Sequence, residues 1–207
     1  MATVQQTDRI GSYTLSDAVL VLALGMLGGI VNVIISSLPH PHFELWGARA
    51  PYAAFFVLAP VIAMLLIRKP GVALVAALIY GLIQTIARGN PNNMVFGLTE
   101  GPGAELVFAL FRYRRLDALS AFLAGGIGAK TLANLWRLAT ASSGPMMGGM
   151  QAPQYAPWQQ FVGGEILGLV VFGILSGLGG WALAQLIERT QVPERLRARW
   201  GHTARSQ

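Results

Sequence analysis

The chain has 207 residues, of which 54% are hydrophobic and 12% are charged, and its formal net charge is +6. With a mean hydropathy of +0.52, this composition excludes an ordinary soluble domain and indicates an integral membrane protein. The basic residues stand in short connectors and in the C-terminal tail, so they do not indicate nucleic-acid binding. The absence of cysteine excludes disulfides and a thiol nucleophile.

Six apolar runs predict an all-α integral membrane protein that forms a single domain over residues 1–207. The polar N-terminus lacks the features of a cleaved signal peptide, so we expect the first run to remain as a helix. Each run is close to the roughly 17–25 residues that a helix needs to cross a bilayer. The six predicted transmembrane helices cover residues 15–38, 51–67, 71–88, 94–111, 117–140 and 158–187, and a basic tail follows at 188–207.

The placement of Lys and Arg predicts the orientation of these helices. With a cytoplasmic N-terminus, eleven basic residues fall on the inner side and three on the outer side, and Lys130 lies within the fifth run. Basic residues near helix ends are retained on the cytoplasmic side, so both termini should be cytoplasmic. The inner residues are Arg9, Arg68, Lys69, Arg112, Arg114, Arg115, Arg189, Arg195, Arg197, Arg199 and Arg205, and the outer ones are Arg49, Arg88 and Arg137.

The first run contains three closely spaced glycines, Gly25, Gly28 and Gly29. Small residues at this spacing let the backbone of another helix approach closely. The glycines therefore form either a docking face for a partner subunit or a contact with a neighbouring helix of the same chain, and the sequence leaves both alternatives open.

Several polar and aromatic residues are expected near the outer ends of the helices. Gln84 lies toward the outer end of the third run, and Asn90 lies in the turn that follows this run. Amide groups there could bind a ligand, although such residues are also ordinary turn formers. Trp46 and Tyr52 lie at the same predicted level and could cover an outward-facing site or anchor the chain at the interface.

The fourth predicted helix carries Glu100 and Glu105. A charged side chain at bilayer depth costs at least about 2.5 kcal/mol, so it usually marks a binding site or pathway. Counted at about 1.5 Å per residue from the outer helix ends, Glu100 lies about 9 Å deep, Glu165 about 10 Å, Lys130 about 15 Å and Glu105 about 16 Å.

Lys130 could pair with one glutamate and hold helices together, but it cannot neutralise three. The remaining carboxylates favour a small cationic or planar ligand from outside, with Trp136 and Asn134 near the entrance. We expect no metal site and no cofactor. His40, His42 and Glu44 have the residue types of a metal site, but the proline between the histidines favours an exposed loop.

Two observations argue against catalysis by this chain. Residues 124–131, AGGIGAKT, resemble the end of a phosphate-binding loop but have alanine at both required glycine positions. All three histidines lie outside the predicted helices. We therefore predict no ATPase site, and a membrane-embedded enzyme is the less favoured reading.

Three motifs occur in order along the chain: RKPG at 68–71, GNP at 89–91 and GPGAELVF at 101–108. With six predicted helices, they make the chain resemble the YkoE family of substrate-binding S components of energy-coupling-factor (ECF) importers, which are associated with thiamine and its hydroxymethylpyrimidine precursor. Cobalt and nickel S components instead carry an N-terminal Met-x-His chelate, whereas this chain starts Met-Ala-Thr.

The resemblance implies capture of a vitamin at the outer side of the bacterial cytoplasmic membrane. It also implies a transmembrane coupling subunit and two ATP-binding subunits as partners. Glu105, within the matching GAE segment, would contact the substrate, and Gly25, Gly28 and Gly29 would dock the coupling subunit. A stand-alone proton-coupled carrier that uses Glu100 or Glu105 remains the alternative.

Overall fold

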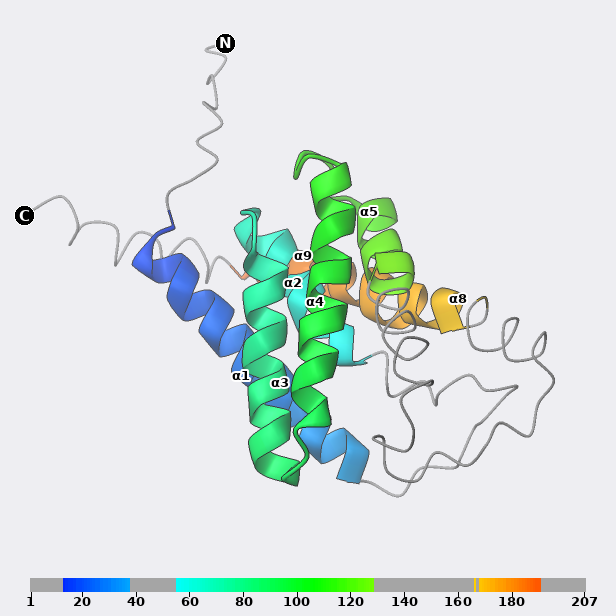
Figure 1. Ribbon diagram of the computed structural model, residues 1–207. Helices are drawn as coiled ribbons and strands as arrows, with labels where there is room; N and C mark the ends of the chain where they lie inside the picture. Colours follow the sequence, from blue (N-terminus) through cyan, green and yellow to red (C-terminus); the bar gives the residue numbers. More distant parts are fainter. Residues whose placement is uncertain (1–12, 38–54, 129–165, 167, 191–207) are drawn as a thin grey trace, which may run out of the picture.

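The computed structural model describes residues 13–37, 55–128, 166 and 168–190, and helices dominate these ranges (Figure 1). No strand occurs within them, which confirms the all-α prediction for this part of the chain. The elements are α1 (Leu15–Ser37), α2 (Phe55–Ile67), α3 (Val72–Arg88), α4 (Asn92–Leu110), α5 (Ala118–Leu123), the π-helical segment η2 (Ala124–Gly128), α8 (Gly168–Phe172), the π-helical segment η4 (Gly173–Leu178) and α9 (Gly179–Arg189).

Two described helical segments are long and apolar enough to cross a membrane, Leu15–Ile35 and Leu169–Arg189. Shorter apolar helices cover Val57–Ile67, Val72–Arg88 and Ala118–Gly128. The predicted third and fourth helices agree with α3 and α4 to within two residues. Much of the fifth and sixth predicted helices lies outside the described residues, so the count of six stays a prediction.

Helix α2 forms the centre of the described bundle. Its residues from Val57 to Ile67 are almost all buried, and the helix contacts α1, α3, α4, α9 and η4. A helix that is apolar on every side lies either in a protein core or in lipid, and the neighbours of α2 show that it lies in the core of this bundle. Helix α3 in turn lies between α1 and α4 (Figure 1).

Glycines bring the helices into backbone contact. A Cβ at Gly97 of α4 would lie 2.6 Å from the carbonyl oxygen of Ala77 in α3, and a Cβ at Gly125 of η2 would lie 2.6 Å from the amide nitrogen of Gly177 in η4. Small residues at such crossings allow close van der Waals packing in a membrane. The positions of α3 and α4 relative to each other are therefore set by backbone contact.

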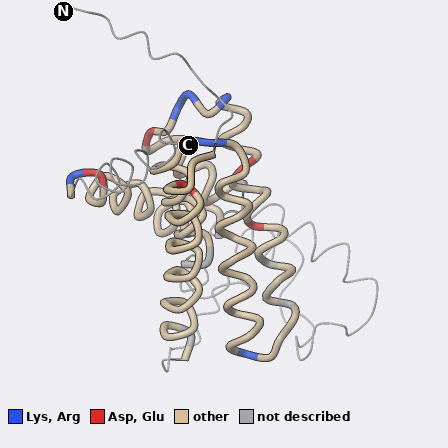
Figure 2. The backbone as a smooth tube through the Cα atoms, turned by 90° about the vertical axis from the view of Figure 1, so that its left-hand side faces the viewer, with Lys and Arg blue, Asp and Glu red and all other residues tan. Residues whose placement is uncertain are grey.

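The described charges concentrate at one end of the bundle, which we call the Lys69 end (Figure 2). It contains the α2–α3 turn, the C-terminal end of α4 and the end of α9. An ion pair of 3.0 Å between Arg68, which follows α2, and Glu188 of α9 connects two of these parts. The opposite end contains Arg88, and we call it the Arg88 end. The basic residues of the Lys69 end are Arg68, Lys69, Arg112, Arg114, Arg115 and Arg189.

Candidate functional site

A stripe of polar residues follows the buried face of α3. Tyr80, Gln84 and Arg88 are spaced four residues apart, so they lie one above another on the same side of the helix. Tyr80 is 2% exposed and Gln84 is fully buried. The sequence therefore places Tyr80 and Gln84 inside an apolar bundle, where each must find a partner, whereas Arg88 at the end of the helix is exposed.

Helix α1 supplies two of these partners. The side-chain amide of Gln84 donates a hydrogen bond of 2.8 Å to the carbonyl oxygen of Gly29, and the guanidinium of Arg88 donates one of 3.3 Å to Oδ1 of Asn32. Asn32 is itself buried. Oε1 of Gln84 is buried and has no hydrogen-bond donor within the described residues.

Glu100 extends this cluster onto α4. It is 5% exposed and stands eight residues after Asn92, about 12 Å from that end of the helix. Its negative charge and the positive charge of Arg88 both act on the hydroxyl of Tyr80. Asn32, Tyr80, Gln84, Arg88 and Glu100 together form what we call the polar core.

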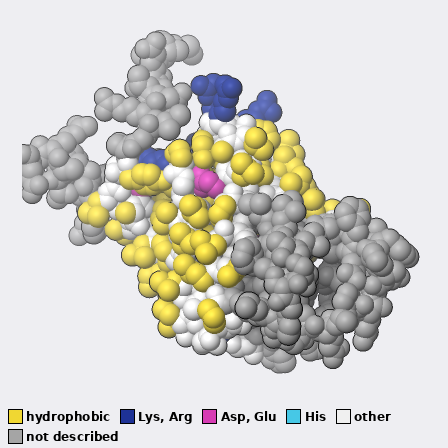
Figure 3. Space-filling view, in the orientation of Figure 1, with side chains coloured by type: hydrophobic (Ala, Val, Ile, Leu, Met, Phe, Trp, Pro, Cys, Tyr) yellow, Lys and Arg dark blue, Asp and Glu magenta, His cyan; other side chains and the backbone are white. Residues whose placement is uncertain are grey.

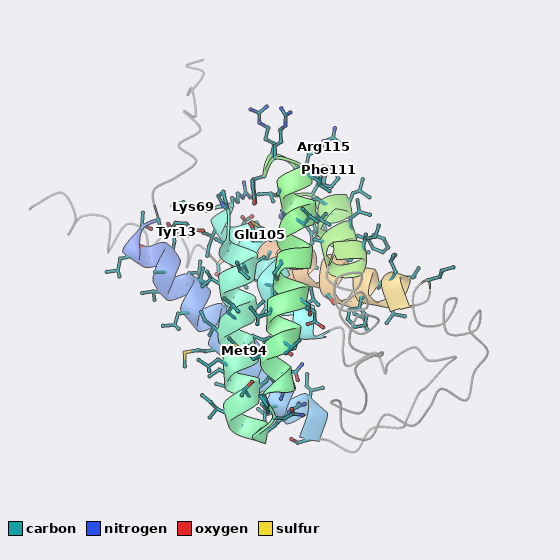
Figure 4. The ribbon with its side chains drawn as sticks, viewed as in Figure 1. Tyr13, Lys69, Met94, Glu105, Phe111 and Arg115 are labelled. Atoms are coloured by element: carbon teal, nitrogen blue, oxygen red, sulfur yellow. The ribbon has the colours of Figure 1, made fainter. Side chains whose placement is uncertain are left out.

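Glu105 lies elsewhere, at the Lys69 end. Its carboxylate accepts hydrogen bonds from the backbone N–H of Gly71 at 2.6 Å, from that of Ala73 at 3.0 Å and from the hydroxyl of Tyr113 at 2.8 Å. Figure 4 shows Glu105 at the same end as Lys69 and Phe111, with Met94 at the other end of α4. Glu105 therefore caps the start of α3 from a neighbouring helix.

Glu100 and Glu105, which the sequence groups as carboxylates that a ligand would neutralise, therefore have different surroundings. Five residues advance a helix by about 7.5 Å and turn it by roughly 140° beyond one full revolution, so the two side chains point in different directions. The first N–H groups of α3 need an outside acceptor because its N-cap, Gly71, has no side chain. A direct contact of Glu105 with substrate stays a prediction.

The contacts around Glu105 continue onto α1. Lys69 forms an ion pair of 2.6 Å with Asp17, and its ammonium lies 5.6 Å from the centre of the Tyr13 ring. The hydroxyl of Tyr13 donates to the carbonyl oxygen of Pro70. Burial and the hydrogen bond to Glu105 raise the pKa of Tyr113 far above its usual value, so its hydroxyl keeps its proton. This end of the bundle is held by polar contacts between α1, α4 and the turns.

Gly25, Gly28 and Gly29 face other helices of this chain. A Cβ at Gly28 would lie 2.4 Å from Cβ of Ala59 in α2, and Cβ atoms at Gly25 and Gly29 would lie within 2.9 Å of Ile79 and Ile83 in α3. This geometry favours internal packing over a docking face. Docking of a partner on these glycines stays a prediction that the observed packing does not support.

The remaining predicted site residues are not brought together within the described structure. Asn90 is exposed in the α3–α4 turn, where its carbonyl oxygen accepts from the side chain of Asn93 at 3.1 Å. No group of three or more His, Cys, Asp or Glu side chains is found among the described residues. Six predicted residues lie outside the described ranges: Trp46, Tyr52, Lys130, Asn134, Trp136 and Glu165.

A family model described as the permease component of an ABC-type cobalt transport system matches residues 16–131, more than half of the chain. The chain belongs to this permease family. The matched residues contain α1 from its second residue and all of α2 to α4, and therefore both the polar core and the contacts of Glu105.

Two further comparisons agree with this assignment to a transport family. A protein of Bacillus subtilis (strain 168) named as the HMP/thiamine permease protein YkoE is 25% identical over 186 residues, which cover 87% of each chain. The crystal structure of an S component of an ECF transporter aligns with a TM-score of 0.72 at 22% identity, covering 95% of this chain and 99% of that one. The permease thus has the fold of an S component, and its resemblance to YkoE is confirmed.

Sequence reasoning did not select Asn32, Tyr80 and Arg88 as site residues of this permease. The four-residue spacing of Tyr80, Gln84 and Arg88 was the available signal, because it places all three on one helix face. The pairing of Arg88 with Asn32, 56 residues apart, depends on how α1 packs on α3 and has no counterpart in local sequence.

Proposed function

We propose that this permease is the substrate-capturing subunit of an ECF-type importer and that it binds thiamine or its hydroxymethylpyrimidine precursor. Three comparisons support the proposal: the transport family, the S-component fold and the relative named as an HMP/thiamine permease. The observation that ties the proposal to a site is the acidic side chain of Glu100, which is 5% exposed and lies within the polar core.

The distribution of charge supports the proposed orientation. Six of the seven basic residues in the described ranges belong to the Lys69 end, and Arg88 is the seventh. Because Lys and Arg favour the cytoplasmic side, the Lys69 end faces the cytoplasm and the polar core lies toward the outer side. In the proposed topology, six helices cross the bacterial cytoplasmic membrane and both termini are cytoplasmic.

The chemistry of the polar core suits an aminopyrimidine. Glu100 and Oε1 of Gln84 are buried hydrogen-bond acceptors on adjacent helices, and an exocyclic amino group supplies two donors. A carboxylate also offsets the positive charge of a thiazolium ring, which aromatic faces can hold. Lys130, Asn134, Trp136, Glu165, Trp46, Tyr52 and Asn90 complete the proposed substrate contacts.

The proposed partners are a transmembrane coupling subunit and two ATP-binding subunits. The described part of the AGGIGAKT segment forms η2, where Gly125 and Gly126 pack against η4. A phosphate-binding loop instead connects a strand to a helix and points its N–H groups at the nucleotide. The proposal therefore assigns ATP hydrolysis to the partners and no enzymatic activity to this chain.

Calorimetric titration of the purified protein with thiamine and with hydroxymethylpyrimidine tests the proposal. We expect saturable binding of one ligand per chain. A pyrimidine with the exocyclic amino group removed is the matched control, and it should bind at least about tenfold more weakly because buried acceptors lose their donors. If neither thiamine nor hydroxymethylpyrimidine binds, or if the control binds as tightly as they do, the proposal is contradicted.

A stand-alone proton-coupled carrier is the second candidate, because the buried carboxylate of Glu100 beside Tyr80 could also hold a transported proton. Reconstitution in liposomes separates the two functions. The S-component function requires that vitamin accumulates only with the coupling and ATP-binding subunits and ATP. Accumulation by this chain alone under a proton gradient supports the carrier.

A further inference from the structure

We propose that the α4–α5 turn binds the phosphate of an anionic membrane phospholipid. The turn carries Arg112, Arg114 and Arg115, whose side chains are all exposed. Figure 3 shows basic side chains at this end of the molecule, directly above an apolar surface. The inference requires that the chain lies in a membrane, but it does not depend on the identity of the transported molecule.

The three arginines differ from the other basic residues of the Lys69 end. Arg68 and Lys69 are paired with Glu188 and Asp17, whereas no ion pair involves the three arginines within the described part of the chain. The nearby carboxylate of Asp117 accepts a hydrogen bond of 2.9 Å from the backbone N–H of Ser120. Three arginines and one aspartate give this turn a local excess of two positive charges, which attracts an anion.

The turn that carries these arginines has a defined conformation. Arg112 and Tyr113 have backbone φ angles of 53° and 55°, which residues other than glycine seldom adopt. Backbone hydrogen bonds from Arg112 to Ala109 and from Arg114 to Phe111, at 2.8 and 3.0 Å, stabilise this conformation. The guanidinium groups are therefore presented from a preorganised backbone, which lowers the entropic cost of binding.

The adjacent apolar surface favours a lipid over a soluble anion. Leu106 and Leu110 lie one helical turn apart on α4 and are 55% and 75% exposed, and Leu119 of α5 is 56% exposed. Exposed leucines on the helices before and after the turn suit the acyl chains of a phospholipid, and the arginines of the turn suit its phosphate. Arginine also binds phosphate through two parallel N–H donors, which lysine cannot do.

Native mass spectrometry of the full chain in a non-ionic detergent tests this site. The protein is titrated with phosphatidylglycerol and with phosphatidylcholine that has the same acyl chains, and we expect tighter binding of phosphatidylglycerol. Replacing all three arginines by glutamine should abolish this preference. The single change Arg114→Gln should weaken phosphatidylglycerol binding about fivefold, since each arginine near an anionic surface contributes roughly that factor.

Arg189→Gln is the control, because it removes an exposed charge of the same end from a different helix. It should change the lipid preference less than about twofold, because salt screens the interaction between exposed charges over a Debye length. A preference that survives the triple change, or that Arg189→Gln reduces as strongly as Arg114→Gln, overturns the proposal. Full competition by millimolar inorganic phosphate also overturns it, because the site would then hold a soluble anion.

Discussion

The hydroxyl of Tyr113 donates a hydrogen bond of 2.8 Å to Oε1 of Glu105, and the same oxygen accepts from the N–H of Gly71 at 2.6 Å. One carboxylate therefore joins α4, the turn after it and the start of α3. These contacts occupy Glu105, the acid that the family resemblance suggested for substrate binding. Substitution of Glu105 can therefore measure how much it contributes to stability.

Replacing Glu105 by alanine should lower the free energy of unfolding by about 2–4 kcal/mol, because two backbone N–H groups and one hydroxyl lose their acceptor. Tyr113→Phe removes a single hydrogen bond and should cost about 1 kcal/mol. Thermal unfolding of the purified variants in detergent measures both effects. Equal losses for the two variants would show that the carboxylate does not hold α3 through its N–H groups.

The contrast between two ion pairs provides a second prediction. Lys69→Met should destabilise the protein by about 2–3 kcal/mol, because it leaves the carboxylate of Asp17, whose side chain is 4% exposed, without its cation. Arg68→Met is the matched control, since its pair with Glu188 is 56% and 36% exposed and should be worth less than about 1 kcal/mol. Similar melting temperatures for the two variants would contradict this ranking.

Gly28 provides a test of how α1 packs. Gly28→Ala should cost about 1–3 kcal/mol, because the new methyl group would lie 2.4 Å from Cβ of Ala59. Gly179→Ala is the control, because Gly179 is also helical and a Cβ added there would meet no atom closer than 3.8 Å. That change should be neutral or stabilise the helix by up to about 1 kcal/mol. If Gly28→Ala left the isolated chain as stable as wild type and weakened only assembly with a coupling subunit, the docking alternative would be favoured.

The limits of α3 and the start of α4 could be predicted from sequence because proline and glycine stand in the turns before and after α3. Gly71 and Gly89 have φ angles of 83° and 61°, so each turn uses the conformational freedom that glycine provides. The site was harder to predict. Counting residues from one helix end gives the depth of Glu105 along α4, but it gives neither the direction of its side chain nor the location of the unsatisfied N–H groups of α3.

Asp117 makes the stability of α5 depend on pH. The hydrogen bond from the N–H of Ser120 holds the pKa of Asp117 below its usual value of 3.8. A carboxylate whose folded-state pKa is lowered stabilises the fold above its unfolded-state pKa, and this contribution disappears as the pH falls through the folded-state value. Wild-type stability should therefore decrease below about pH 3.8.

Asp117→Asn is the control for this titration, because asparagine caps a helix as well as aspartate does but carries no charge. Thermal unfolding between pH 5 and pH 3 should show a smaller decrease for this variant than for wild type. Identical pH profiles would exclude Asp117 as a source of acid sensitivity. Asp117→Ala should cost about 1 kcal/mol at neutral pH, since it removes the cap altogether.

Glu100 and Glu105 should separate ligand binding from stability. Glu100→Gln should weaken vitamin binding by roughly 10-fold to 100-fold, because a charge-assisted hydrogen bond is lost, while the melting temperature stays close to that of wild type. Glu105→Gln should lower the melting temperature, because the amide cannot accept all three hydrogen bonds, and it should have the smaller effect on affinity. Calorimetry on both variants measures the difference. If affinity depended on Glu105 and not on Glu100, the substrate contact would belong to the Lys69 end, and the polar core would serve only to join α1, α3 and α4.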